Sequence, residues 1–331
     1  MDYYIYLPLS LSLGWLGAWS VMKKAGSYGL IDHPGNRSSH SRPTPKGGGI
    51  GILLAFAAVS LLVDTPATVW IPALLISVLG LVDDRIDLSM FGRLLVHLAC
   101  ALVVIFGEGD DLDQFLPAAL LWGMVGAVFV VGTANTFNFM DGINGMAGII
   151  AIVAFGLLTV YGHSMDVSQP YLVLNLCIVF ACAGFLPFNL PRAKVFMGDT
   201  GSVLLGFLFA TMVWKMNPTL LGVVTCAAFF FLVYADTITT MAIRYLQGDD
   251  ILVPHRRHLY QIMVNEFGLP HWLVASVYGT AQLLIGLLIL VLHEMGIFAV
   301  ASGLIVLGAT FVVTSVVAHR RADQLSALET H

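Results

Sequence analysis

Charged residues are scarce in this chain. Asp, Glu, Lys and Arg make up 11% of its 331 residues, against roughly 25% in an ordinary soluble domain. Hydrophobic residues make up 58%, and the mean hydropathy is +0.88. So few charges exclude a disordered chain, a coiled coil and a pair of soluble domains, because none of these keeps such an apolar surface in water. Most of the surface is therefore expected to face lipid.

Cysteine is also rare. The four cysteines lie inside apolar runs without metal-ligand spacing, which excludes a disulfide scaffold and indicates inert packing residues. The first ten residues, MDYYIYLPLS, carry no basic residue. We therefore expect a first membrane span there and not a cleaved signal peptide. The cysteines are Cys100, Cys177, Cys182 and Cys226.

Long apolar runs are abundant and predict an all-α polytopic membrane protein. A helix needs about 20 apolar residues to cross the hydrocarbon, or slightly fewer. We expect one integral membrane domain over residues 1–331, without the inverted repeats of a secondary transporter. Eleven spans are predicted: 3–22, 47–63, 68–82, 91–107, 116–133, 146–162, 170–188, 201–214, 219–242, 273–292 and 296–318.

The positive charges predict the orientation of these spans. With the N-terminus outside, fourteen of the fifteen Lys and Arg residues lie in or next to cytoplasmic segments, and only Lys215 does not. This asymmetry is the positive-inside signature, so we expect the N-terminus outside and the C-terminus in the cytoplasm. The cytoplasmic segments are 23–46, 83–90, 134–145, 189–200, 243–272 and the tail from 319.

Acidic residues gather where two of these spans meet the cytoplasmic side. The third span ends in Asp83-Asp84-Arg85-Ile86-Asp87. Neighbouring carboxylates repel, and acids at a helix C-terminus oppose the helix dipole. A divalent metal or a proton-transfer role would explain this placement, while a solvated helix end is the alternative.

Asp236 lies inside the ninth span, where acids are costly; it has either a site role or an ion pair with Arg244.

Two further loops combine polar residues with glycines. In Asn135-Thr136-Phe137-Asn138-Phe139-Met140-Asp141, a spacing of three places Asn135, Asn138 and Asp141 on one helix edge, which suits a nucleobase; a capped turn is the alternative. Asp199 in NLPRAKVFMGDTGS precedes a new helix. Such a carboxylate beside cations could hold Mg²⁺ and a diphosphate, or it could simply cap the helix.

Basic residues in the first and last long loops indicate phosphate binding. Lys46 precedes three glycines, which form either a weak phosphate loop or a close helix contact. The segment His255-Arg256-Arg257-His258-Leu259-Tyr260-Gln261 combines two Arg with two His residues. Arg binds phosphate through two parallel hydrogen bonds and His transfers protons near neutral pH, whereas attraction to anionic lipid head groups is the more general explanation.

Taken together, these motifs resemble a known family. DDRID, NTFNFMDGINGMAG, NLPRAKVFMGDTGS and HRRHLYQ occur in this order on one predicted membrane face. They resemble the polyprenyl-phosphate N-acetylhexosamine-1-phosphate transferases of glycosyltransferase family 4, which include phospho-N-acetylmuramoyl-pentapeptide transferase. The resemblance implies transfer of a sugar 1-phosphate from a UDP-sugar to undecaprenyl phosphate with release of UMP, at the cytoplasmic face of the bacterial inner membrane.

The resemblance also implies roles for individual residues. It assigns catalysis to Asp83, Asp84, His255 and His258, and a Mg²⁺ or Mn²⁺ ion to Asp199 and Asp84. For substrate binding it assigns Asn138, Asp141, Asn189 and Phe196. The character of the loops themselves adds five further substrate-binding candidates: Lys46, Asn135, Lys194, Arg256 and Arg257. The expected partners are the UDP-N-acetylhexosamine, undecaprenyl phosphate and the bilayer, with a homodimer left open and no nucleic acid.

Two departures from relatives affect the expected substrate. Many relatives have Asp where this chain has Asn144, which weakens a metal role at that position. HRRHLYQ replaces the HxHH pattern and resembles the branch that starts O-antigen synthesis in lipopolysaccharide. We therefore expect a 6-deoxy donor sugar such as FucNAc or QuiNAc, with a UDP-GlcNAc or muramoyl-pentapeptide enzyme as the alternative. A transporter is the alternative from another class, but it would place its ionisable groups near the membrane midplane.

Overall fold

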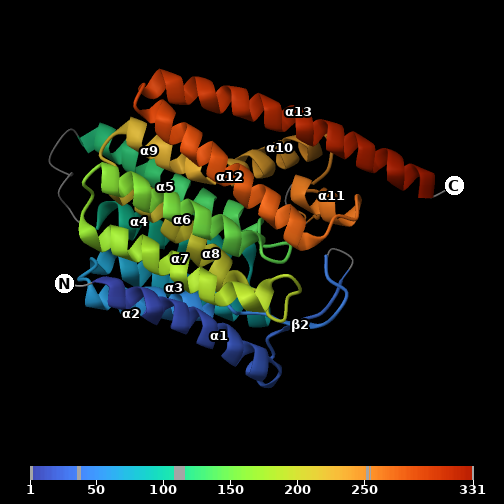
Figure 1. Cartoon of the computed structure of the whole chain (residues 1–331), viewed down its shortest axis with the longest axis horizontal. Coiled ribbons are helices and arrows are strands. Elements are labelled where there is room, and N and C mark those ends of the chain that lie inside the picture. Colours follow the sequence, from blue (N-terminus) through green and yellow to red (C-terminus); the bar gives the residue numbers. More distant parts are fainter. Residues whose placement is uncertain (1–2, 36–38, 108–115, 251–252, 254, 330–331) are drawn as a thin grey trace.

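The computed structural model describes the chain except residues 1–2, 36–38, 108–115, 251–252, 254 and 330–331. Its described residues form a bundle of helices that lie along the long axis of the molecule (Figure 1). The elements are η1 (Tyr3–Ile5), α1 (Tyr6–Tyr28), β1 (Ile31–Asp32), β2 (Thr44–Pro45), α2 (Ile50–Leu62), α3 (Ala67–Ile86), α4 (Met90–Phe106), α5 (Leu116–Asn138), α6 (Met146–Ser164), α7 (Gln169–Asn189), α8 (Asp199–Lys215), α9 (Leu220–Ala227), η2 (Ala228–Phe230), α10 (Phe231–Gln247), α11 (Leu259–Asn265), α12 (His271–His293) and α13 (Ile297–Glu329).

The helical membrane class expected from the sequence is confirmed. Within the described residues, seven helices are long and apolar enough to cross a bilayer: α3, α5 from Leu120, α6, α7, the run from α9 to α10, α12 and α13 as far as Leu325. The apolar helices α2 and α4 are shorter. Each of the eleven predicted spans falls on one of the helical segments. The count of eleven spans and their orientation stay predictions.

Some predicted boundaries are wrong. The ninth span corresponds to the run Leu220–Gln247, which ends five residues past the predicted end at 242 and contains the 3-10 turn η2 between α9 and α10. The last helix continues eleven residues past the predicted end at 318. Its extension is held by contacts with the loop before α11, where His319 Nε2 lies 2.9 Å from the Arg257 carbonyl oxygen and Arg257 forms an ion pair with Asp323. A purely helical chain was expected, but β1 and β2 form a small antiparallel sheet.

Helix α8 forms the centre of the bundle. Every residue from Thr200 to Val213 is buried, and the helix packs mainly against α3 and α5. Because a helix that is apolar on all sides must be surrounded by other helices, its first residue, Asp199, is fixed among the ends of the neighbouring helices. This end of the bundle also carries the β1–β2 sheet and α11 (Figure 1).

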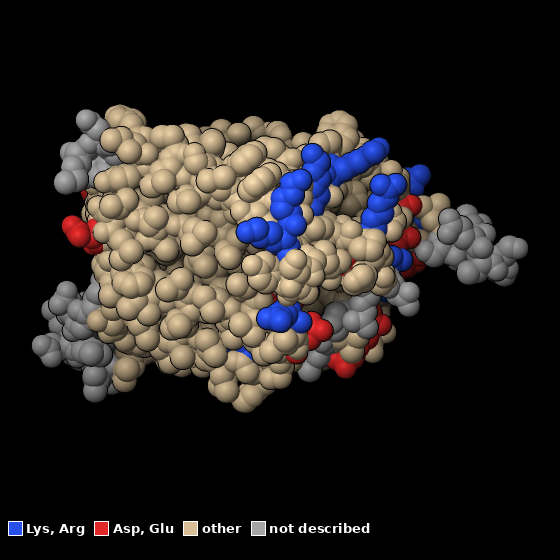
Figure 2. Space-filling model, turned by 90° about the horizontal axis from the view of Figure 1, so that it is seen from below, with Lys and Arg blue, Asp and Glu red and all other residues tan. Residues whose placement is uncertain are grey.

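The charges on one face of the molecule follow the same axis. Figure 2 shows a broad surface without charged side chains, and the Lys and Arg side chains on that face gather toward the end that carries the sheet and α11. On that face the cations therefore lie toward one end of the bundle, and the side of the membrane that this end faces stays a prediction.

Candidate active site

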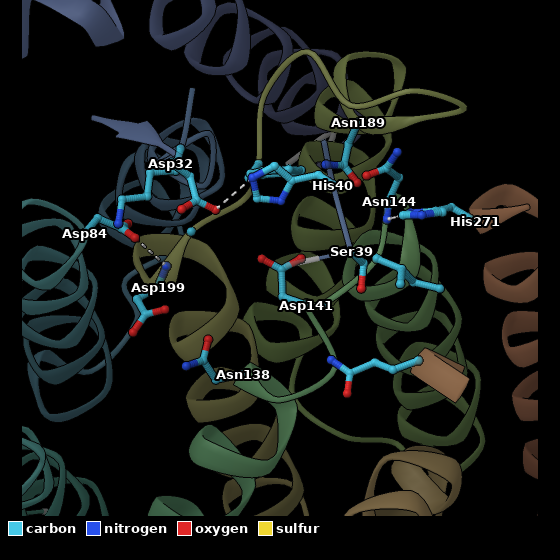
Figure 3. Close-up of a pocket in the computed structure, with 16 residues that line it drawn as sticks. Asp32, Ser39, His40, Asp84, Asn138, Asp141, Asn144, Asn189, Asp199 and His271 are labelled. Atoms are coloured by element: carbon cyan, nitrogen blue, oxygen red, sulfur yellow. Dashed lines mark hydrogen bonds and ion pairs between the residues drawn. The ribbon is translucent and has the colours of Figure 1, made fainter. Parts of the chain in front are cut away.

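A cavity of about 340 Å³ opens at the end of the bundle where α8 begins. Figure 3 shows Asp84 and Asp199 on one side, Asn144 and His271 on the other, and Asp141 between them. Seven residues singled out from the sequence line it: Lys46, Asp84, Asn138, Asp141, Asn189, Phe196 and Asp199. The other lining residues are Asp32, Ser39, His40, Gly142, Ile143, Asn144, Gly198, Gln261 and His271. The fold therefore brings the Lys46 loop and the first three motifs to one cavity.

Asp84 connects α3 to the start of α8. Its Oδ1 accepts the backbone N–H of Asp199 (3.2 Å), and its Oδ2 accepts the backbone N–H and the hydroxyl of Thr200 (3.3 and 2.9 Å). These N–H groups have no partner within their own helix. Asp84 therefore caps α8 from another helix, and the alternative in which Asp199 caps its own helix is wrong: α8 begins at Asp199 and its N-cap is Gly198.

A cation that the sequence motifs did not include joins two of the acids. The guanidinium Nη1 of Arg93, on α4, forms an ion pair with the Asp83 carboxylate and lies 3.2 Å from Oδ2 of Asp199. Asp83 also accepts the backbone N–H of Leu88 at 2.6 Å, and it does not line the cavity. A lone arginine within a predicted span was the signal for this contact, because such a cation needs an anionic partner.

The acids influence one another's ionisation. Burial, followed by the negative charges of Asp84 and Asp83, raises the pKa of Asp199 to about 7 against the opposing charge of Arg93. Burial, with the charges of Asp199 and Asp84, also holds the pKa of Asp141 well above its usual range. Carboxylates crowded in this way are stabilised by a cation placed between them.

The residues fit a Mg²⁺ ion that takes few ligands from the protein. Among the described residues, no group of three His, Cys, Asp or Glu side chains is arranged to hold a metal by itself. Mg²⁺ usually binds one or two carboxylates and completes its shell with water and substrate phosphates. Of the two acids predicted to bind a metal, Asp199 would be the better placed, because both carboxylate oxygens of Asp84 already bond to the start of α8.

Other predicted residues hold the walls of the cavity. Asn189 accepts the backbone N–H of Gly145 (2.5 Å) and donates to the carbonyl oxygen of Val195 (2.9 Å), so it ties the start of α6 to the segment before α8. Asn138 accepts the hydroxyl of Ser202 at 2.5 Å. Asn135 instead donates to Val131 within α5 and does not line the cavity.

The first loop supplies part of the opposite wall. Lys46 lines the cavity, and the rings of His40 and Phe196 meet edge to face with centroids 4.8 Å apart. A Cβ on Gly49 would lie 2.3 Å from the Cα of Gly201. Only glycine allows this approach, so the glycine run explains close packing of the loop against the start of α8, as one of the two sequence interpretations expected.

Residues 67–217 match the sequence model described as glycosyl transferase family 4. This match contains three of the four motifs and the acids that meet at the start of α8. Over this segment, which is just under half of the chain, the protein is similar to that family. Together with the relatives named below, the match identifies the chain as an enzyme, and it spans 74% and 71% of the length of two of those relatives.

Those relatives share a reaction class by name. A "Probable undecaprenyl-phosphate N-acetylglucosaminyl 1-phosphate transferase" of Bacillus subtilis (strain 168) is 29% identical over 76% of this chain and 74% of its own length. A "Decaprenyl-phosphate N-acetylglucosaminephosphotransferase" of Mycolicibacterium smegmatis is 27% identical over 76% and 71%. A "Phospho-N-acetylmuramoyl-pentapeptide-transferase" of Staphylococcus epidermidis is 31% identical over 59% and 57%.

The fourth motif of this transferase lies beyond the family match and is placed differently from the first three. None of residues His255–His258 lines the cavity; Gln261 is the residue of the motif that does. Arg257 donates to Gln247 and Asp323, and Arg256 is exposed. Burial, together with the charges of His258, Arg244 and Arg257, lowers the pKa of His255 to about 4. In this arrangement His255 is neutral at pH 7.

A second, larger cavity of about 760 Å³ adjoins the first. The two share Ser39, His40, Asn144, Phe196 and His271. The second cavity adds Arg42 and Arg192 to its lining, whereas the predicted Lys194 is exposed and lines neither. Asn144 donates its backbone N–H to Nδ1 of His271 at 3.1 Å. His40 and Arg42 belong to the first loop, whose basic residues indicated phosphate binding, whereas sequence reasoning missed His271 because it belongs to none of the four motifs.

Proposed function

We propose that the enzyme transfers an N-acetylhexosamine 1-phosphate from a UDP-sugar to a polyprenyl phosphate, namely undecaprenyl phosphate, and releases UMP. The observation that carries this proposal is the convergence of Asp84, Asp141 and Asp199 with Lys46 and Phe196 in one cavity. Acids that can hold a divalent cation, a lysine and an aromatic ring suit the parts of a nucleoside diphosphate. The names of the relatives support the same reaction class.

The chemistry needs positioning and charge neutralisation more than covalent machinery. An oxygen of the lipid phosphate forms a bond to the β-phosphorus of the donor, the bond between that phosphorus and the oxygen bridging to the α-phosphate breaks, and the electron pair leaves with UMP. A Mg²⁺ ion held by Asp199 would neutralise charge on the diphosphate. Lys46 would bind a phosphate oxygen.

The remaining lining residues provide the nucleoside contacts and the framework. Phe196 offers a ring for stacking on uracil, and Asn138 with Asp141 offers hydrogen-bonding groups for the nucleoside. Asp84 fixes the backbone of the first turn of α8, and Asp83 holds Arg93 against Asp199. The lipid phosphate would be positioned by this Asp83–Arg93–Asp199 cluster.

The cavity lies where the two substrates can meet. Its walls are helix ends of an apolar bundle, so a lipid acceptor and a water-soluble nucleotide reach the same end of the molecule. The gathering of Lys and Arg at this end (Figure 2) supports a cytoplasmic position in the bacterial plasma membrane.

The identity of the sugar is a finer proposal. The relatives reported above are named for N-acetylglucosamine or the muramoyl pentapeptide, whereas the form of HRRHLYQ favours a 6-deoxy sugar such as FucNAc or QuiNAc for O-antigen synthesis. In the structure this motif contributes Gln261 and the neighbouring Tyr260 to the region of the cavity.

A donor panel tests both levels of the proposal. The purified enzyme is mixed with undecaprenyl phosphate, Mg²⁺ and one of UDP-GlcNAc, UDP-GalNAc, UDP-FucNAc, UDP-QuiNAc or UDP-muramoyl-pentapeptide, and UMP release is measured. We expect release with at least one donor, only when lipid and Mg²⁺ are present, and a preference for the 6-deoxy sugars. Preference for UDP-GlcNAc would overturn the sugar assignment, and no UMP from any donor would overturn the reaction.

A further inference from the structure

One buried carboxylate has no part in the proposed chemistry. Asp236 lies in α10 and is fully buried. The ion pair expected between Asp236 and Arg244 is wrong, because Arg244 donates to the carbonyl oxygen of Asp250 and pairs with Asp249. The partners of Asp236 are Leu259 N (2.9 Å), Tyr260 N (3.4 Å), Tyr278 Oη (2.9 Å), Thr240 Oγ1 (3.1 Å) and His258 Nδ1 (3.3 Å).

These contacts hold α11 in place. The helix has seven residues, and its first two backbone N–H groups donate to Asp236. A hydroxyl from α12 donates to the same carboxylate, so α10, α11 and α12 meet at one group. A carboxylate is the suitable side chain, because it only accepts hydrogen bonds and is here surrounded by donors. A buried charge is tolerated when it is bonded in this way.

The helix held by Asp236 forms part of the wall of the cavity. Gln261 lines the cavity, and the hydroxyl of Tyr260 donates to the carbonyl oxygen of Phe139 at 2.6 Å. A Cβ on Gly142 would lie 2.3 Å from Tyr260 Oη and 2.8 Å from Gln261 Nε2. Helix α11 therefore packs directly against the 139–142 turn, which carries Asp141 into the cavity (Figure 3).

We propose that Asp236 is a positioning residue for the donor pocket. Asp236 binds the start of α11 and so keeps Tyr260 and Gln261 in contact with the 139–142 turn. This contact holds Asp141 in position. The same contacts give His258 a structural place on Asp236, away from the cavity lining. This inference rests on the proposed function in one respect, because it takes the pocket to bind the UDP-sugar. The contacts from Asp236 through α11 to the 139–142 turn do not depend on that function.

The kinetic test compares Asp236→Asn with a matched control. Asn places an NH₂ donor against N–H and O–H donors, so α11 should loosen while the side chain keeps its size. We expect the KM for the UDP-sugar to rise at least about tenfold and the KM for the lipid to change less than about twofold. The control is Gln282→Leu, which removes buried hydrogen bonds of α12 to Leu232 and Ala228, neither of which lies in α11.

A double-mutant cycle separates positioning from general loss of stability. Tyr260→Phe removes the hydroxyl that links α11 to the 139–142 turn. If Asp236 acts through this link, Asp236→Asn and Tyr260→Phe combined should raise the donor KM by clearly less than the product of their separate effects. Gln282→Leu should combine with Tyr260→Phe independently. An equal rise in both KM values for Asp236→Asn, or independent effects of Asp236 and Tyr260, would overturn the proposal.

Hydrogen exchange gives a readout that does not depend on activity. In Asp236→Asn, the amides of α11 and of the 139–142 turn should exchange faster than in the wild type, and in Gln282→Leu they should not. A wild type that transferred no sugar phosphate but showed this exchange pattern would contradict the proposed function. It would still support the role of Asp236 in holding α11 and the 139–142 turn. Unchanged exchange at both segments in Asp236→Asn would overturn the positioning role itself.

Discussion

Replacing Arg93 with Gln should move the pH dependence of transfer to higher pH. Burial and the neighbouring acids raise the pKa of Asp199 to about 7, and Arg93, 3.2 Å away, keeps it from rising further. Without this cation, the pKa of Asp199 rises further. If Asp199 must be ionised to hold Mg²⁺, activity then appears only at higher pH, and the acid limb of the profile shifts upward.

The size of the shift follows from the contact. A hydrogen bond to a charged group contributes about 1.5–3 kcal/mol, and one pKa unit corresponds to about 1.4 kcal/mol. The Arg93 side chain is 32% exposed, so solvent screening favours the lower end of this energy range. The pKa of Asp199 should then rise by about one unit. The ionised fraction of Asp199 at pH 7 would fall from about one half to about one tenth, which predicts about a fivefold loss of activity at limiting Mg²⁺.

The assay is UMP release at limiting Mg²⁺ between pH 6 and 9, for the wild type, Arg93→Gln and Arg85→Gln. Arg85 is a matched control, because it lies near the same end of α3 but lines a groove between α1, α2 and α3 and not the cavity. The ratio of wild-type to Arg93→Gln activity should shrink by about fivefold between pH 7 and pH 9, because Asp199 is then ionised in both enzymes, whereas any loss of lipid positioning is the same at every pH. A loss that is equal at every pH, or a matching shift in Arg85→Gln, would refute the role given to Asp199.

Three further outcomes follow from the site. Asp84→Asn should lower the free energy of unfolding by about 1–3 kcal/mol, because it weakens the cap on α8; thermal unfolding in detergent measures this. In Mg²⁺-free buffer at pH 7, Asp141→Asn should bind UMP within about threefold of the wild type and Asp141→Ala at least about tenfold more weakly, since the raised pKa favours the neutral acid, whose hydrogen-bonding groups Asn resembles and Ala lacks; calorimetry measures both. Phe196→Ala should weaken UMP inhibition and donor binding in parallel, and unchanged inhibition would place the nucleoside elsewhere.

Much of the fold could be predicted because the signals are local. Apolar runs and the clustering of Lys and Arg depend on short windows of sequence, and the predicted spans fall on helices accordingly. The break at η2 and the extension of α13 could not be predicted, because they depend on contacts between distant segments, such as Gln282 with Leu232 and His319 with Arg257.

The site shows the same division. The motif residues Asp84, Asp141 and Asp199 were identified from the sequence, and the fold brings them to one cavity. Their partners were not predicted: Asp84 caps a helix 115 residues away in the sequence, and Arg93 joins Asp83 to Asp199. Such contacts arise from packing of α3, α4 and α8, for which residue spacing gives no signal.

The fate of the β-phosphorus tests the central claim most directly. UDP-GlcNAc or UDP-QuiNAc labelled with ³²P at the β-phosphate is incubated with the purified enzyme, undecaprenyl phosphate and Mg²⁺, and the lipid and aqueous phases are separated. Transfer of a sugar 1-phosphate predicts label in the lipid product, unlabelled UMP in the water, and loss of both in Asp199→Asn. Label that stays in the aqueous phase as UDP would show transfer of the sugar alone and would contradict the account.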